Sequence, residues 1–298
     1  MAEDQEKVLF QRVSLIGLGL IGSSLARAIK RRGLASEIVG YARSKKTRET
    51  ALGLGFIDRA EETAATAVEG ANLVVIAVPV GATGAIVQEI APALSVGAIV
   101  TDVGSVKGAV VEAVAPHIPE GVHFVPGHPV AGTEESGPEA GFAELFEGRW
   151  CIITPSPGSD AGAVARVESL WRAVGSEVDQ MDPQHHDMVL AITSHLPHLI
   201  AYTIVGTATD LQNHLQREVI KFAAGGFRDF TRIAASDPVM WRDVFLANKD
   251  AVLEMLGRFD EDLTALQRAI RYEDGAALEE IFSRTRDIRR SIVEAGQA

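Results

Sequence analysis

Cysteine is nearly absent from this sequence. Among its 298 residues there is one, Cys151, so neither an internal disulfide nor a zinc site built from cysteines can form. Cys151 lies in the apolar run Trp150-Cys151-Ile152-Ile153, which is typical of a buried strand. Because apolar burial raises the pKa of a thiol, we expect this one to be inert.

Long apolar runs are also missing. None approaches the roughly 18–20 residues that a membrane helix needs, and the longest, such as Leu73–Val80, are strand-sized and close with a proline. The first eleven residues are acidic and lack the charged-then-apolar pattern of a signal peptide. Since 47% of the residues are hydrophobic, full-sized cores are expected. We therefore expect a soluble, cytoplasmic protein that contacts no membrane.

Basic residues are in short supply. The chain has 28 Lys and Arg against 40 Asp and Glu, a net charge of −12. This balance argues against a nucleic-acid partner, because affinity for nucleic acid comes from neutralising phosphates. The same charge repels anionic substrates, so a site for one must gather its own arginines.

Strand-like and helix-like segments alternate through the first 181 residues. This alternation predicts βαβ units and a mostly parallel sheet, that is, an α/β Rossmann-type domain. The expected strands are Val13–Gly17, Glu37–Tyr41, Leu73–Val78, Ala98–Val103, Val122–Val125, Trp150–Thr154 and Glu177–Asp179, and the expected helices are Ser23–Arg32, Thr47–Leu54, Thr83–Leu94, Pro138–Leu145 and Asp160–Val174.

Only helical patterns follow Met181. Asp182-Pro183 is a good helix start, with aspartate as the N-cap and proline at the first helical position. The expected helices are Pro183–Asp210 with a kink at Pro197, Leu211–Ala223, Phe227–Ala235 after a Gly225-Gly226 break, Pro238 to about Arg271, and Asp274–Ala295. We predict two domains, residues 1–181 and an all-α domain of residues 182–298. Because long amphipathic helices often bury their apolar faces against a copy of themselves, a homodimer through the C-terminal helices is expected.

A glycine fingerprint stands between the first expected strand and helix. Gly17-Leu18-Gly19-Leu20-Ile21-Gly22 matches G-x-G-x-x-G in the context that predicts a dinucleotide site. Gly17 permits the tight turn, Gly19 lets the backbone approach the pyrophosphate, and Gly22 lets helix and strand pack closely. The helix N-terminus offers free N–H groups to the phosphates. The alternative is a glycine-rich turn that binds nothing.

An acidic residue is absent from the end of the second expected strand. Ala42 stands where an Asp or Glu would bind the ribose hydroxyls of NAD. Beside it, Arg43, Ser44 and Lys46 are able to bind a 2′-phosphate. These residues favour NADP, or the use of both cofactors. The alternative is that they are solvated loop residues and that NAD binds through its other contacts.

Two polar clusters, Asp102–Lys107 and Gly127–Glu134, directly follow expected strands. Ligands of open α/β sheets bind at these carboxyl ends. His128 lies between glycine and proline in a shaped turn, so it is a candidate general base with a pKa near the working pH. The alternative is a loop histidine bonded to backbone.

The helical half adds a histidine pair. His195 and His198 are three residues apart and share a helix face, and Pro197 between them bends the helix. A histidine pair also suggests a metal, but no third ligand stands at a familiar spacing, so we expect none.

An arginine pair follows a glycine loop in the same half. Arg228 and Arg232 are four residues apart and make the positive site that the acidic chain otherwise lacks. An arginine fork suits carboxylates because it binds both oxygens. The alternative is a surface pair bridged to Asp229 or Asp243.

Five motifs, GLGLIGSSLA, DVGSVK, GHPVAGTE, SHLPH and GGFRDFTRIAASDPVMWRD, occur in this order and resemble the prephenate/arogenate dehydrogenase family of tyrosine biosynthesis. The resemblance runs from about Arg12 to Arg290, and the later motifs are far more specific than the glycine fingerprint. It implies oxidative decarboxylation of prephenate to 4-hydroxyphenylpyruvate, or of arogenate to tyrosine, with hydride transfer to NAD or NADP.

The resemblance also implies roles for single residues. His128 takes the proton of the substrate's ring hydroxyl, Ser105 lies between that hydroxyl, the histidine and the nicotinamide, and Arg232 binds a carboxylate of the dicarboxylate substrate. Substrate contacts are expected from His195, His198, Arg232, Arg228, Trp241, Glu134 and Thr133, and cofactor contacts from Gly17, Gly19, Leu20, Ile21, Gly22, Arg43, Ser44, Val78, Pro79 and Ser105.

Two other functions compete with this one. Dehydrogenases of the β-hydroxyacid type share the layout but rely on a catalytic lysine in the helical half, and Lys221 and Lys249 lie outside the polar motifs. A dinucleotide-binding regulator without catalysis would show a degenerate site, whereas His128, Ser105 and Arg232 are kept together here.

Members of the family are also found fused to a chorismate mutase or to a regulatory domain. The segment before Val13 is short, and the last residues are helical without a βαββαβ pattern. We therefore expect the single-activity form.

Overall fold

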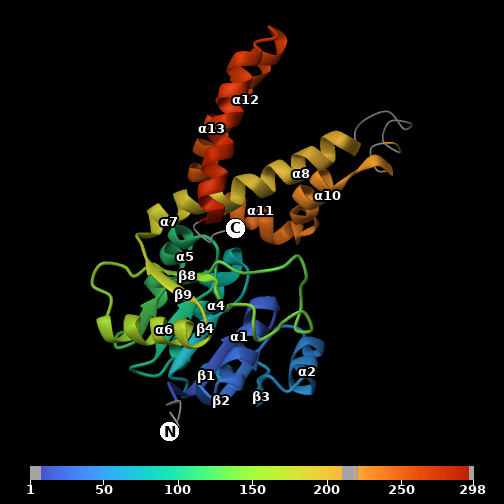
Figure 1. Cartoon of the computed structure of the whole chain (residues 1–298). Coiled ribbons are helices and arrows are strands. Elements are labelled where there is room, and N and C mark those ends of the chain that lie inside the picture. The colour runs from blue at the N-terminus through green and yellow to red at the C-terminus, as the bar shows by residue number, and fades with distance from the viewer. Residues whose placement is uncertain (1–7, 210–217, 219–220, 295–298) are drawn as a thin grey trace, which may run out of the picture. The chain divides into compact units, whose positions relative to one another are not determined.

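The computed structural model describes residues 8–209, 218 and 221–294. The chain forms two compact units, Met1–Lys249 and Asp250–Ala298 (Figure 1). The domain boundary expected near residue 181 falls inside the first unit and stays a prediction. Most of the expected helix Leu211–Ala223 lies outside the described residues.

A six-stranded parallel sheet organises the first unit, in the order β3-β2-β1-β4-β5-β6. Its strands are β1 (Phe10–Ile16), β2 (Ala35–Tyr41), β3 (Arg59–Ala60), β4 (Leu73–Ile76), β5 (Ile99–Asp102) and β6 (His123–Val125). The expected Rossmann-type fold is confirmed. Strand order reverses between β1 and β4, so the crevice for a ligand lies at their carboxyl ends.

Both faces of this sheet are covered by helices, which is why the central strand β4 is a short, continuous apolar run, LVVI. Leu73 and Val75 of β4 point into one core, and Val74 and Ile76 point into the other. The first core is shared with α1 (Leu20–Arg31), α2 (Lys45–Gly53) and α6 (Ala161–Ala173), and the second with α3 (Ala64–Val68), α4 (Thr83–Ile90) and α5 (Lys107–Val114).

A smaller sheet carries the GHP motif. It consists of β7 (Gly127–Pro129), β8 (Trp150–Ile153) and β9 (Glu177–Gln180), with β7 antiparallel to β8 and β8 parallel to β9. Cys151 of β8 is buried as expected, and burial raises the pKa of its thiol. Its inertness stays a prediction.

The helix expected at Pro138–Leu145 is wrong. Residues 130–149 run as turns and extended chain without a helix. Gly137 adopts a φ of 91°, and the backbone N–H of Phe142 donates to Ser24 Oγ on α1 at 3.1 Å. This hydrogen bond ties the segment to α1.

The first unit ends in helices that differ in detail from the expected ones. They are α7 (Pro183–Leu190), the π-helical turn η4 (Ala191–His195), α8 (Leu196–Thr209), α10 (Gly225–Thr231), the 3-10 turn η5 (Arg232–Ala235) and α11 (Pro238–Ala247). The π turn ends just before Pro197, whose missing N–H cannot continue a regular hydrogen-bond ladder. The kink expected at Pro197 stays a prediction. Gly225 and Gly226, which were expected to lie in a break between helices, are the first two residues of α10.

The continuous stretch Pro183–Thr209 is long and apolar enough to cross a membrane, with a mean hydropathy of 1.5 in an 18-residue window. The sequence predicted a helix here, Pro183–Asp210, but no apolar run of membrane-spanning length, because histidines interrupt its apolar residues. Only 28% of that window is buried. Its polar residues, however, are tied into the first unit, since Asp187 accepts a hydrogen bond from the backbone of Lys107.

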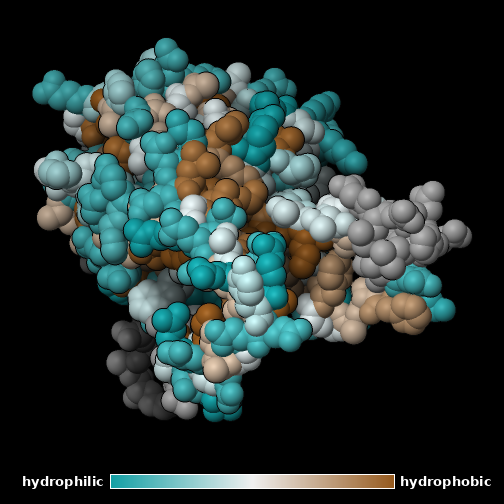
Figure 2. Space-filling view, turned by 90° about the horizontal axis from the view of Figure 1, so that it is seen from above, coloured by the Kyte–Doolittle hydropathy of each residue, from teal (hydrophilic) through white to brown (hydrophobic). Residues whose placement is uncertain are grey.

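The second unit is a helical hairpin of α12 (Lys249–Arg271) and α13 (Gly275–Glu294). The helix expected from Pro238 to Arg271 is therefore two helices, separated at Asn248. Apolar side chains remain on the surface of the molecule, where they show as brown among teal polar groups in Figure 2. On the helices they include Ile204, Phe222, Leu246, Leu253, Ile270, Phe282 and Ile288.

Candidate functional site

A cleft of about 650 Å³ opens at the carboxyl ends of β1 and β4. Gly17 has a φ of 109°, and a Cβ there would lie 2.2 Å from the carbonyl oxygen of Ala77. A Cβ on Gly22 would lie 2.1 Å from the carbonyl oxygen of Gly17. These two glycines are therefore needed by the fold itself, because no side chain fits between the backbones.

Gly19 differs from the other two glycines of the fingerprint, Gly17 and Gly22. It lines the cleft, and a Cβ built on it would meet nothing within 4 Å. It is also the N-cap of α1, which has no side-chain cap and no acidic residue in its first turn. Open space beside uncapped N–H groups fits the pyrophosphate of a dinucleotide.

The cleft includes part of the expected cofactor set. Gly17, Gly19, Arg43, Ser44, Val78 and Pro79 line it, whereas Leu20, Ile21, Gly22 and Ser105 do not. Tyr41, Thr47, Ile86 and Pro138 are further lining residues that sequence patterns did not single out.

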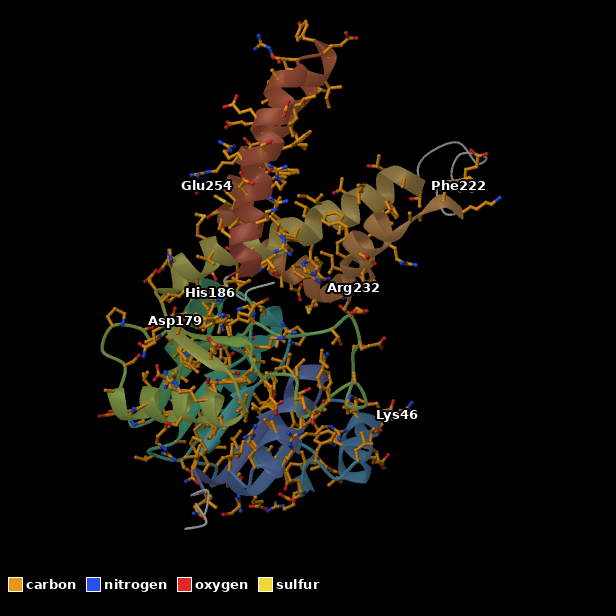
Figure 3. All side chains as sticks on the ribbon, viewed as in Figure 1. Lys46, Asp179, His186, Phe222, Arg232 and Glu254 are labelled. Carbon is orange, nitrogen blue, oxygen red and sulfur yellow. The ribbon has the colours of Figure 1, made fainter. Side chains whose placement is uncertain are left out.

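The basic loop after β2 forms one wall of the cleft. Ser44 Oγ accepts from the backbone N–H of Thr47 at 3.3 Å, so it caps α2. The guanidinium of Arg43 has no ion-pair partner within the described ranges and lines the cleft. Lys46 is exposed and points outward from α2 (Figure 3). Of the three expected phosphate contacts, only Arg43 offers a free cation to the cleft.

A buried ion pair anchors the strand that carries His128. Lys107 bonds to Asp102 and donates from Nζ to the Gly127 carbonyl at 2.7 Å, while Asp102 Oδ1 accepts from the Gly127 N–H at 3.2 Å. Burial lowers the pKa of Lys107, and the Asp102 carboxylate opposes this effect. The backbone N–H and C=O of Gly127 are thus both held by charged side chains that are themselves hydrogen-bonded.

His128 lies on β7 and is 7% exposed. Its Nδ1 lies 2.8 Å from His186 Nε2, and His186 Nδ1 lies 2.8 Å from Asp187 Oδ1. Figure 3 shows His186 on α7, above the sheet. Burial lowers the pKa of His128 well below 6.5, and His186, Lys107 and His195 act in the same direction. His128 is therefore neutral at working pH, with a pKa lower than the sequence suggested.

His195 is fully buried at the end of the π turn. Its Nδ1 lies 3.0 Å from Asn248 Nδ2, which also donates to the Asp187 carbonyl at 2.8 Å. Its Nε2 is buried and has no hydrogen-bond partner in the described part of the chain. Burial lowers the pKa of His195 to about 4.

His198 belongs to an aromatic group on the same helices. Its ring stacks on Trp241 with centroids 3.7 Å apart, and its Nδ1 donates to the Ser194 carbonyl at 2.8 Å. Burial lowers the pKa of His198, and the positive charge of Arg232 adds to this. Trp241 Nε1 is buried, and no described residue bonds to it. His195, His198 and Trp241 thus form one apolar-walled cluster with unpaired polar atoms.

Arg232 and Glu134 form an ion pair at 2.9 Å, although 98 residues separate them. Figure 3 shows Arg232 beneath the α8–α10 helices. Arg228 is exposed and faces Asp229 at 3.7 Å. Thr133 is exposed, and its hydroxyl oxygen accepts from the N–H of Glu135. Of the two arginines, therefore, only Arg232 is tied to the GHPVAGTE motif, through Glu134.

Ser105 lies half-buried in the turn between β5 and α5. Its hydroxyl has no hydrogen bond to any described residue, which leaves it open to a ligand.

Sequence patterns gave no individual role to five polar residues that hold this cluster together: Asp102, Lys107, His186, Asp187 and Asn248. Asp102 and Lys107 lie inside the DVGSVK motif, so their charges in an apolar stretch were an available signal. His186 and Asp187 follow the helix start at Asp182, where they look like surface residues of a first turn. Asn248 has no local signal.

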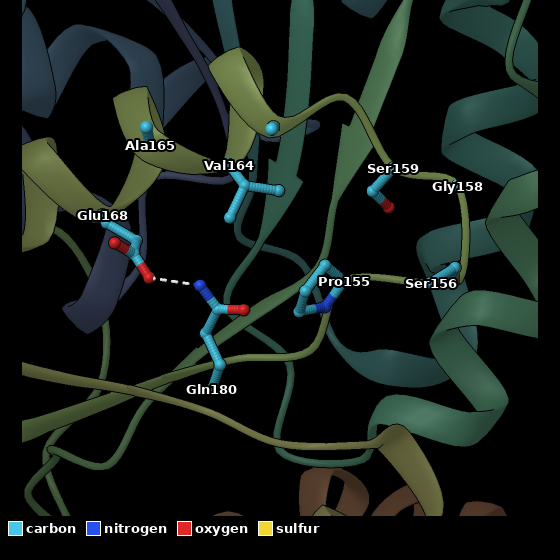
Figure 4. Close-up of a pocket in the computed structure, with 9 residues that line it drawn as sticks. Pro155, Ser156, Gly158, Ser159, Val164, Ala165, Glu168 and Gln180 are labelled. Atoms are coloured by element: carbon cyan, nitrogen blue, oxygen red, sulfur yellow. Dashed lines mark hydrogen bonds between the residues drawn. The ribbon is translucent and has the colours of Figure 1, made fainter.

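A second hollow, of about 340 Å³, lies at the start of α6 (Figure 4). Glu168 accepts a hydrogen bond across it from Gln180 Nε2 at 2.6 Å. None of the expected site residues lines this hollow. Among residues 8–209, 218 and 221–294, no group of three or more His, Cys, Asp or Glu side chains is placed to hold a metal ion.

Two family models match the chain. The model described as prephenate dehydrogenase, nucleotide-binding domain, matches residues 25–180, and the model described as prephenate dehydrogenase, dimerization domain, matches residues 182–284.

Two relatives carry related names. The cyclohexadienyl dehydrogenase of Zymomonas mobilis subsp. mobilis is 41% identical over 94% of this chain and 96% of its own length. The prephenate dehydrogenase of Bacillus subtilis is 37% identical over 93% of this chain and 75% of its own length.

The fold is shared with solved structures. Prephenate dehydrogenase from Aquifex aeolicus, in complex with hydroxyphenyl propionate and NAD+, superposes with a TM-score of 0.88 at 36% identity, covering 95% of this chain and 98% of that one. Arogenate dehydrogenase from Synechocystis gives a TM-score of 0.79 at 27% identity, covering 94% and 99%.

Proposed function

The chain belongs to the prephenate dehydrogenase family of cyclohexadienyl dehydrogenases, and we propose that its glycine-lined cleft and its histidine cluster act together on one substrate. The reaction is the oxidative decarboxylation of prephenate or arogenate. The observation that carries this assignment of roles is His128, a buried neutral histidine held by its Nδ1. The β-hydroxyacid and non-catalytic alternatives lose their basis with family membership.

His128 Nε2 takes the proton of the substrate's ring hydroxyl as the C–H bond at the same carbon breaks. When bound, the nicotinamide accepts that hydride. The bond to the ring carboxylate then breaks, CO2 leaves, and its electron pair completes the aromatic ring. The ring oxygen, left as a phenolate, takes its proton back from His128, which returns the base to its neutral state. Aromatisation supplies the driving force, so the protein mainly has to position the groups and move one proton.

The other residues bind and orient. Arg232 binds a substrate carboxylate in exchange for Glu134, its partner in the structure. His195, His198 and Trp241 form the wall that excludes water, and the open hydroxyl of Ser105 bonds to the ring hydroxyl. Arg228 and Thr133 are exposed and serve at the rim.

NAD is the cofactor that we propose. The Aquifex aeolicus relative binds NAD+, and the space beside Gly19 fits a pyrophosphate. The preference for NADP that Ala42 and Arg43 suggest has no support from the comparisons, and Ser44 already caps α2. NAD would then bind without an acidic partner at the end of β2.

The homodimer belongs to the same proposal. The matched dimerization-domain model and the exposed apolar residues of the helices, Phe222, Leu246 and Phe282 among them, support pairing through the C-terminal half. We also propose that the chain divides into one domain of residues 1–181 and another of residues 182–298. Since Pro183–Thr209 carries the bonded His186 and His195, we treat it as a wall of the site and place the enzyme in the cytoplasm.

Initial rates in a two-by-two assay test this function, with prephenate or arogenate as substrate and NAD or NADP as cofactor. We expect reduced nicotinamide to form with NAD. An NADP preference would restore the phosphate-binding role of Arg43. No turnover in any combination, with NAD shown to bind by calorimetry, would contradict the proposed function.

A further inference from the structure

Asp187 is the point where two networks of the site meet. Its Oδ1 accepts from the backbone N–H of Lys107 at 2.7 Å, and its Oδ2 accepts from that of Gly108 at 2.8 Å. These are the first two N–H groups of α5, which has no side-chain cap of its own. The carboxylate therefore caps a helix 79 residues away and is held in one orientation by it.

The first network runs from this carboxylate to His128. Because both oxygens of Asp187 already accept from backbone donors, the 2.8 Å contact with His186 Nδ1 requires the proton on that nitrogen. A neutral His186 then has only a lone pair on Nε2. The 2.8 Å contact between this atom and His128 Nδ1 is a hydrogen bond only if His128 carries its proton on Nδ1.

The second network runs from the main chain of Asp187 to His195. The Asp187 carbonyl can only accept, so the Asn248 atom that lies 2.8 Å from it is the amide nitrogen. The same nitrogen lies 3.0 Å from His195 Nδ1, which therefore accepts. A neutral His195 must then carry its proton on Nε2, the buried atom that has no hydrogen-bond partner among the described residues.

We propose that Asp187, through His186 and Asn248, imposes opposite tautomers on the two buried histidines. His128 keeps its proton on Nδ1 and offers an open lone pair on Nε2, whereas His195 offers an N–H donor on Nε2. In the resting enzyme the base can thus only receive a proton, and His195 can only donate a hydrogen bond to an oxygen of bound substrate or cofactor. The catalytic meaning of His128 rests on the proposed function, and the tautomers themselves do not.

Burial supports both steps. His186 and His195 are each 0% exposed, so water cannot replace a missing partner. The charged and titratable groups that face His128 are His186, Lys107 and His195, and together with burial they lower its pKa. Burial also lowers the pKa of His186, although Asp187 opposes this shift. His186, the link between Asp187 and His128, therefore stays neutral.

Long-range ¹H–¹⁵N correlation spectra of the full-length protein labelled with ¹⁵N-histidine test the proposal directly. Spectra of His128→Gln, His186→Gln and His195→Gln identify the three signals. We expect His128 as the Nδ1–H tautomer and His195 as the Nε2–H tautomer. A doubly protonated His186 with His128 protonated on Nε2, or the same tautomer in both histidines, would overturn the proposal.

A matched pair of variants tests the first network by kinetics. His186→Phe keeps a buried ring but removes the acceptor of the His128 Nδ1–H, while His185→Phe alters the exposed neighbour on the same helix. We expect kcat to fall by about 10²–10³ in the first, against the roughly 10⁴-fold loss that a wrong tautomer causes in a serine-protease triad. KM should stay within about twofold, because substrate contacts are kept. Equal kcat values in the two variants would contradict the positioning role.

Asn248→Asp tests the second network. A carboxylate cannot donate to His195 Nδ1, so the histidine should move its proton to Nδ1 and lose the Nε2 donor. We expect this reversal in the spectrum and about a tenfold rise in KM or in the cofactor Kd, the worth of one hydrogen bond. If neither substrate is turned over but the wild-type tautomers are as stated, the proposed function fails and the tautomer proposal stands. If a substrate is turned over but the tautomers differ from those stated, the proposed function stands and the tautomer proposal fails.

Discussion

The glycine loop and the histidine cluster are made in different ways. The loop consists of backbone from one segment, Gly17–Gly22, and its ligand groups are N–H donors at the start of α1. The cluster consists of side chains from β7, α7, η4 and the end of α11, each held by a partner distant in sequence. The loop works through the absence of side chains, the cluster through their exact protonation. Damage to one should therefore show in binding and folding, and damage to the other in the chemical step.

Removing the base should have the largest effect. We expect His128→Asn to lower kcat about 10³–10⁴-fold, because a positioned general base contributes about 10²–10⁴ and the buried site offers no water to replace it. Cofactor affinity, measured by fluorescence quenching or calorimetry, should stay unchanged, since the glycine loop is untouched. A variant that retains a tenth of the activity would show that another group takes the proton.

The loop should respond in stability instead. In Gly17→Ala the new Cβ would meet the Ala77 carbonyl at 2.2 Å, at a φ of 109°. We expect a loss of about 3 kcal/mol or more in the free energy of unfolding, measured with urea.

Gly19→Ala is the matched control, because the same methyl group meets nothing within 4 Å there. The melting temperature should be kept, while NAD binds about tenfold more weakly as the methyl fills the space for the pyrophosphate. Equal stability of the two variants would mean that Gly17 is not constrained by packing.

Acid should destabilise the cluster specifically. Burial lowers the folded-state pKa of His128, His186 and His195, the last from 6.5 to about 4. The unfolded chain therefore binds more protons between these values, so stability is complete above pH 6.5 and is lost as the pH falls toward 4. His195 alone should account for about 3 kcal/mol over this range.

Melting temperatures between pH 8 and 4.5 measure this loss. His195→Asn should flatten the curve, whereas His185→Asn, a change at an exposed position, should leave its slope as it is. A wild-type curve that is flat down to pH 5 would show that these histidines are not neutral in the folded protein.

The smallest effect should come from the ion pair between Arg232 on η5 and Glu134 in the loop after β7. Arg232→Gln removes one charged fork from an exposed position and should raise the KM for substrate about 10–100-fold, with a smaller change in kcat. Arg228→Gln, which alters an exposed pair with Asp229, should change KM less than threefold. If both variants behave alike, Arg232 binds no carboxylate.

The same contrast explains which elements could be predicted. The strands of the parallel sheet and the helix after the glycine loop follow from hydrophobic runs and turn residues, which act over a few neighbours. The helix expected at Pro138–Leu145 failed because Phe142 is hydrogen-bonded to α1 instead. The helix α5 was not expected, since the side chain that caps it is Asp187, far along the chain.

By itself, the sequence determined the Rossmann-type fold, the glycine loop and the family, because periodicity, backbone freedom and motifs are local properties. It also marked three candidate site residues: His128 in a shaped turn, His195 on a helix face, and Arg232 in an arginine pair after a glycine loop. Only the tertiary structure decided that His128 faces His186, that Asn248 faces His195, and that Asp187 joins them. Protonation of a histidine depends on the donor or acceptor opposite each nitrogen, and that partner is chosen by packing, not by spacing along the chain.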